Sequence, residues 1–143
     1  MGLLDSIKQN KTKTINLPVL FVTGMLYAVQ IDGSMTQQDV GKLKGIFEGK
    51  VPSVDDLLKE AVDYQTSTKH AEYLNELQNM ELESSQRICF MANLLDLLLV
   101  DGELHENEIV LYKTYSDAIR LTGSERGAIQ EVIVAKNSIG DFQ

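Results

Sequence analysis

The sequence predicts an all-α fold, a compact bundle of seven helices, and three observations support this class. Apolar residues recur at intervals of three and four in every long segment, which is the spacing of one face of a helix. Only two prolines occur in 143 residues, so few positions are unfavourable to helices. One sequence pattern occurs twice at a constant spacing, which indicates a duplicated helix–turn–helix unit.

The duplicated pattern is an apolar run that ends in Asp-Gly and is followed by a polar turn. The Asp-Gly pairs stand at 32–33 and 101–102, and the second lies 69 positions after the first. Asp39 and Glu108 follow the two turns and are also 69 positions apart. Since glycine readily adopts the left-handed conformation that closes a helix, we expect a helix to end at each pair. The halves are therefore expected to be pseudo-symmetric.

This duplication organises the chain, which at this length is expected to form one domain, residues 1–143, with a substantial core. The expected segments are repeat one over about 17–48, connecting helices over about 53–80, repeat two over about 84–121, and a closing helix over about 124–136. The side chains expected to be almost fully buried are Phe21, Met25, Ala28, Phe90, Leu94, Leu97 and Leu98.

Local signals predict where individual helices begin and end. Thr36, with an acid three positions later, is typical of a capping box at a helix start. The helix over 106–121 is expected to bury Ile109 and to be ended by Gly123. Ser124 is then expected to cap the closing helix.

Composition limits the possible partners and the environment. A net charge of −8 argues against nucleic-acid binding through a broad basic surface, and it fits divalent cations, a basic partner or simple solubility. The single cysteine, Cys89, lies in an apolar run, where we expect it to be buried, and it cannot form an internal disulfide. No signal peptide is visible, and the apolar run over 87–100 is too short to cross a membrane. We therefore expect a cytoplasmic protein.

The first thirteen residues form a short amphipathic segment. Leu3, Leu4 and Ile7 share one helical face, and lysines lie behind them. This segment is either a loosely packed terminus or an element that docks on a membrane surface or a partner. The first six residues also match the N-myristoylation pattern, which has meaning only in a eukaryotic host.

The two Asp-Gly stretches, 28–39 and 97–108, resemble the tellurite-resistance TerB family and its wider TerB-like/DjlA N-terminal superfamily. The opening at 1–8 and the turn at 121–125 are also similar to that family, so the resemblance covers most of the chain. It implies a helical domain of two repeats with a role in resistance to tellurite and other stresses. It further implies complexes with TerC-type membrane proteins at the inner face of the membrane, and no established enzymatic activity.

Five acidic residues are candidate metal ligands, because packing of the two halves would bring the Asp-Gly turns together. They are Asp32, Asp39, Asp96, Asp101 and Glu108. Clustered carboxylates repel one another unless a cation or protons compensate, and oxygen ligands suit Mg²⁺, Ca²⁺ or Mn²⁺. The alternative is that these acids cap helices and stabilise turns, without a metal.

Other chemistries find little support in the sequence. The spacing after Asp101 is not that of an EF-hand, which needs glycine at its sixth position and glutamate at its twelfth. His70 and His105 lack the spacing of zinc ligands, and no glycine-rich phosphate loop occurs. Three classes remain: a TerB-like binding module, with or without a cation; a metal-independent helical adaptor or regulatory domain; and an enzyme that uses carboxylates. We expect a protein that is not an enzyme.

Overall fold

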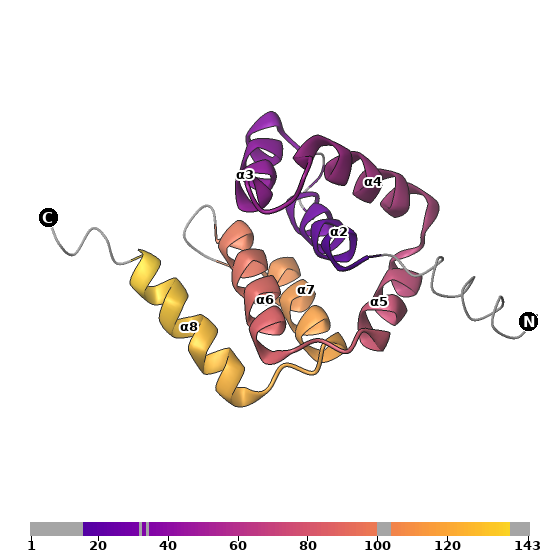
Figure 1. The fold of residues 1–143 in the computed structure, drawn as a ribbon. Helices are drawn as coiled ribbons and strands as arrows, with labels where there is room; N and C mark the ends of the chain where they lie inside the picture. Colours follow the sequence, from indigo (N-terminus) through magenta and orange to yellow (C-terminus); the bar gives the residue numbers. More distant parts are fainter. Residues whose placement is uncertain (1–15, 32, 34, 100–103, 138–143) are drawn as a thin grey trace, which may run out of the picture.

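The computed structural model describes residues 16–31, 33, 35–99 and 104–137, with the side chains of 132–137 excepted. Within these residues the chain forms seven α-helices and no strand, which confirms the predicted class (Figure 1). The helices are α2 (Leu17–Val29), α3 (Gln37–Phe47), α4 (Val54–Ser67), α5 (His70–Asn79), α6 (Ser84–Leu98), α7 (Glu106–Ala118) and α8 (Gly123–Asn137). No described helix has both the length and the apolar character that crossing a membrane requires.

Hydrogen bonds between residues three positions apart stabilise the starts of α2 and α3. The Asn16 side chain accepts the Val19 N–H at 3.0 Å and caps α2, which tolerates Pro18 in its first turn. The predicted capping box of α3 is confirmed. The Asp39 N–H donates to Thr36 Oγ1 at 3.1 Å, and the Thr36 N–H donates to Asp39 Oδ2 at 3.0 Å.

The end of α7 differs from the prediction. A Schellman motif closes this helix, because the Leu121 N–H donates to the Ser116 carbonyl oxygen and the Arg120 N–H to that of Asp117. Arg120, with φ of 59°, takes the left-handed position that glycine usually fills. Gly123 is therefore the first residue of α8 and does not end α7.

The cap of α8 also differs from the prediction. Thr122 caps this helix in place of Ser124, since the Glu125 N–H donates to Thr122 Oγ1 at 3.1 Å. The cap thus lies two residues before the predicted one, because the Schellman motif already reverses the chain at Arg120.

The helices form two groups that meet through α2 and α6. In the first group α4 lies across α2, and in the second α8 lies along α6 (Figure 1). The spacing of 69 residues extends over three helices of each group. α2 and α6 end 69 positions apart, α3 and α7 begin 69 apart, and α4 and α8 begin 69 apart. The segment expected to hold the connecting helices, about 53–80, contains α4 and α5.

The core lies between these helices and contains all seven side chains predicted to be buried. Two other predictions about burial are wrong. Ile109 is 39% exposed, because the inner face of α7 carries Glu108 and Tyr115, seven residues apart, and Ile109 lies beside that face. Cys89 is exposed, because its position on α6 faces away from the stripe that contains Phe90 and Leu94.

An aromatic cluster joins α2, α5, α6 and α7. Tyr73 is fully buried, and its hydroxyl donates to the Leu20 carbonyl oxygen at 2.9 Å. Its ring packs on Tyr115, whose hydroxyl lies 2.9 Å from His70 Nε2. A side chain at Gly24 would meet this cluster, since a Cβ there would lie 2.5 Å from Tyr73 Oη. The absence of a side chain at Gly24 therefore lets α2 approach α5 and α6 closely.

Candidate functional site

The structure describes three of the five predicted acidic ligands. Asp32 and Asp101 lie outside the described residues. Asp39 stands in the first turn of α3, Glu108 in the first turn of α7, and Asp96 in α6, where it is half-buried. Among the described residues no group of three or more His, Cys, Asp or Glu side chains is placed to hold a metal ion, so these three acids do not share a site by themselves.

Asp39 and Glu108 occupy the same position in their helices and make the same bond. Asp39 Oδ2 accepts the Thr36 N–H at 3.0 Å, and Glu108 Oε1 accepts the His105 N–H at 2.8 Å. Each carboxylate therefore satisfies a backbone donor at the start of its own helix and lies near the positive end of the helix dipole. Glu108 is also buried, with 6% of its surface exposed. One oxygen of each acid is thus engaged in capping, as the alternative interpretation expects.

A network of polar contacts between α6 and α8 involves a residue pair that the sequence analysis did not predict. Arg87 of α6 and Glu125 of α8 form an ion pair with Nη2 and Oε2 2.6 Å apart, and Arg87 Nε lies 3.0 Å from Oε1. Arg87 Nη1 also donates to the Leu82 carbonyl oxygen. Ser84 Oγ donates to Glu125 Oε2 at 2.5 Å, and the Thr122 N–H donates to Oε1 at 2.9 Å. Both oxygens of Glu125 are therefore satisfied.

These contacts strongly favour the charged form of Glu125. Hydrogen bonds from Arg87 lower the pKa of the Glu125 carboxyl from its ordinary 4.5 to about 2, although burial acts in the opposite direction. The bonds from Ser84 and from the Thr122 backbone lower this pKa further. Because the pKa is depressed in the folded state, the stabilisation is complete above about pH 4.5 and is lost as the pH falls towards 2. The pair fixes the start of α8 to α6.

A sequence signal for this pair exists. Thr122 and Glu125 have the spacing of a capping box, and Arg87 is a lone base at the start of an apolar run. What the sequence does not show is that α8 folds back onto α6, which brings two side chains 38 positions apart into contact.

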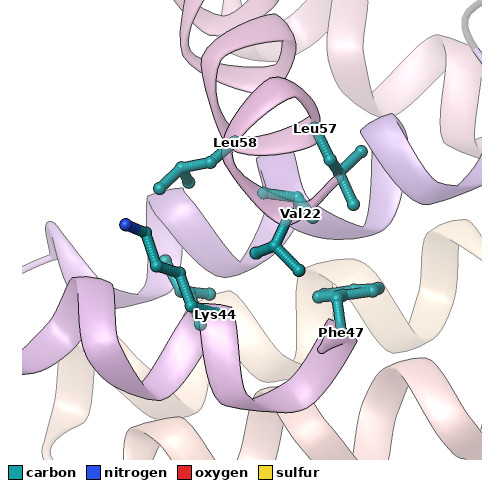
Figure 2. Close-up of a pocket in the computed structure, with 7 residues that line it drawn as sticks. Val22, Lys44, Phe47, Leu57 and Leu58 are labelled. Atoms are coloured by element: carbon teal, nitrogen blue, oxygen red, sulfur yellow. The ribbon is translucent and has the colours of Figure 1, made fainter. Parts of the chain in front are cut away.

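Three hollows lie around α4 in the described part of the chain. The first is apolar and is lined by residues of α2, α3 and α4, among them Val22, Phe47 and Leu58 (Figure 2). Its volume is about 10 Å³, which is the room of a single water, and it offers few polar partners, so it is a gap in the packing and not a ligand site. The second, about 260 Å³, lies where α2 and α4 begin. The third, about 430 Å³, is lined by the end of α3 and the start of α4, including Lys44 and Asp55.

Comparisons of the chain with models of protein families, with curated proteins and with solved structures found no match.

Proposed function

We propose that this chain is a TerB-like stress-response protein of the tellurite-resistance type, acting as an acidic helical module that binds partner proteins. The observation that carries the proposal is the pair of Asp-Gly stretches at a spacing of 69 residues, each between two helices. The helices that flank the two stretches also keep this spacing, since α2 and α6 end 69 positions apart and α3 and α7 begin 69 positions apart. We place the protein in the cytoplasm, in contact with a TerC-type membrane protein at the inner membrane.

A binding role agrees with the chemistry of the described residues. The chain carries a net charge of −8, which favours a basic partner or a cation. The partly buried Arg87–Glu125 pair joins α6 to α8, so it serves to hold the fold.

Growth of the host on tellurite tests this role. Deleting the gene should lower the tellurite concentration that the host tolerates, and expression of the wild-type chain should restore tolerance. Growth without tellurite should stay unchanged, which is the control for a general defect. Equal tolerance of the deletion strain and the parent strain would contradict the proposal.

The proposal has two forms that differ in the role of the acids. In the first, Asp32, Asp39, Asp96, Asp101 and Glu108 hold a divalent cation, Mg²⁺, Ca²⁺ or Mn²⁺. In the second, the module is a metal-independent adaptor or regulatory domain, in which the acids cap helices and turns. The backbone bonds to Asp39 and Glu108 favour the second form for these two residues.

Melting curves in EDTA and in millimolar Mg²⁺, Ca²⁺ or Mn²⁺ separate the two forms. If a cation binds the folded state, its presence at about 100 times the dissociation constant adds about 2.7 kcal/mol to stability. Asp101→Asn should then reduce this gain and also stabilise the metal-free protein, because it relieves repulsion between carboxylates.

Under the metal-independent form, cations leave the melting temperature unchanged. Glu108→Ala then costs about 1 kcal/mol with or without metal, because it removes the bond to the His105 N–H. The absence of any cation-dependent shift in the wild-type chain would exclude the first form.

A further inference from the structure

His70 is the first residue of α5 and lies among tyrosines of three helices. Its ring centroid is 4.5 Å from that of Tyr27 in α2, 6.2 Å from that of Tyr73 in α5 and 5.8 Å from that of Tyr115 in α7. Its Nε2 atom lies 2.9 Å from the Tyr115 hydroxyl oxygen. Because α5 packs against α7, this hydrogen bond joins the start of α5 to the last turn of α7.

The burial of Tyr115 decides which of the two groups donates in this bond. Tyr115 is fully buried, and among the described residues His70 is the only hydrogen-bond partner of its hydroxyl. If Nε2 carried the proton, the hydroxyl proton would have no acceptor in the core, which is costly. A neutral His70 with its proton on Nδ1 avoids this cost, because Nε2 is then an acceptor. The Tyr115 hydroxyl therefore donates to His70 Nε2.

Protonation of His70 would remove that acceptor, and two further features oppose a positive charge at this position. His70 stands in the first turn of α5, near the positive end of the helix dipole. Burial lowers the pKa of its imidazole from the ordinary value of 6.5. The tyrosines in ring contact with it, Tyr27, Tyr73 and Tyr115, are neutral near pH 7, since burial raises the pKa of each.

The charged side chains of the neighbouring helices do not compensate a proton on His70. α2 contains no charged residue. At the start of α5, Lys69 is itself positive, and Glu72 accepts the Lys69 N–H at 3.0 Å. On α7, Glu108 lies two turns before Tyr115 and accepts a backbone N–H at the start of its own helix. Among the described residues no acid forms an ion pair or a hydrogen bond with His70.

We propose that His70 and Tyr115 form a pH-sensitive contact, which holds α5 against α7 while the imidazole is neutral and releases α5 when the imidazole gains a proton. In the open state His70 faces water and takes up the proton at its ordinary pKa of 6.5. The contact is therefore complete above pH 6.5 and weakens as the pH falls below it, until the lower pKa of the folded state is reached. This inference concerns the regulation of the fold and does not rest on the proposed function.

Hydrogen exchange of the full-length, ¹⁵N-labelled chain at about pH 7.5 and about pH 5.5 tests the proposal, because the two values lie on either side of the ordinary pKa of histidine. Rates are compared with those of an unstructured chain at the same pH, which gives protection factors. In the wild-type chain the protection factors of α5 should fall by up to about tenfold, since each pH unit below 6.5 shifts the opening equilibrium by at most about tenfold. The amides of α5 should also be less protected than those of α6 at the lower pH. Equal protection of the two helices there would show that α5 is not released by itself.

His70→Gln is the variant that keeps an acceptor and cannot gain a proton. The side-chain amide of glutamine can occupy the place of Nε2 and accept the Tyr115 hydroxyl, so the protection of α5 should change by less than about twofold between the two pH values. His105→Gln removes the other histidine of the chain and should retain the loss seen in the wild type. An unchanged loss in His70→Gln, or its disappearance in His105→Gln, would overturn the proposal.

NMR titration of the His70 ring separates the effect of the contact from that of burial alone. In the wild type near pH 7.5 the ring nitrogen shifts should show the proton on Nδ1, with Nε2 as acceptor. Tyr115→Phe removes the hydroxyl and keeps the aromatic ring, so the pKa of His70 should rise towards 6.5 and the pH-dependent loss of protection should shrink. If His70 titrates alike in Tyr115→Phe and in the wild type, burial alone lowers its pKa and the proposed contact is wrong.

Discussion

Leu98→Ala is expected to lower the free energy of unfolding by about 2–5 kcal/mol. Leu98 is 2% exposed and stands in the last turn of α6, the helix that contacts α2, α7 and α8. Removing its side chain loses buried apolar surface and leaves a cavity, which well-packed neighbours fill only in part. Urea unfolding at 25 °C, followed by far-ultraviolet circular dichroism, measures the loss.

Val110→Ala is the control for this prediction. Val110 is 58% exposed on α7, so its truncation should change stability by less than about 0.5 kcal/mol. Similar stabilities of the Leu98 and Val110 variants would contradict the assignment of α6 as the central helix.

Gly24→Ala is expected to destabilise the protein by about 1–3 kcal/mol through overpacking. The new Cβ would lie 2.5 Å from Tyr73 Oη and 2.7 Å from Phe90 Cζ, so α2 must move away from α5 and α6 or both rings must shift. A shift of Tyr73 would also strain its bond to the Leu20 carbonyl oxygen. Helix propensity acts in the opposite direction, since alanine is favoured over glycine by about 1 kcal/mol.

Gly41→Ala provides the matched comparison in α3. A Cβ at Gly41 has no neighbour within 4 Å among the described residues, so only helix propensity acts and the variant should be up to about 1 kcal/mol more stable. Opposite signs for the two substitutions, measured in the same urea experiment, are the expected result. A stabilised Gly24 variant would show that the aromatic cluster packs less tightly against α2 than described.

Features encoded within a few residues could be predicted from the sequence. Residues within one or two helical turns were enough to predict three features. These are the capping box of α3, Pro18 in the first turn of α2, and the buried face of α6. The end of α7 could not be predicted in this way. Arg120 adopts a conformation that is usually taken by glycine, so the sequence drew attention to Gly123, three residues later.

The candidate sites also differ in whether they depend on local sequence or on how the helices pack. That Asp39 and Glu108 cap their helices follows from local spacing, and the structure contains both bonds. The Arg87–Glu125 pair depends on which helices pack together, and no single stretch of sequence shows this.

The aromatic cluster determines which helices tyrosine absorbance and fluorescence can report on. The chain has no tryptophan, and four of its five tyrosines, Tyr27, Tyr64, Tyr73 and Tyr115, are in contact with one another or with His70. Tyrosine absorbance and fluorescence therefore report on α2, α4, α5 and α7. α8 contains no aromatic residue, so its separation from α6 would lower helical ellipticity and would alter the tyrosine signals mainly through Tyr112, which lies near Arg126 of α8. The two signals coincide during unfolding only if α8 is lost together with the rest of the fold.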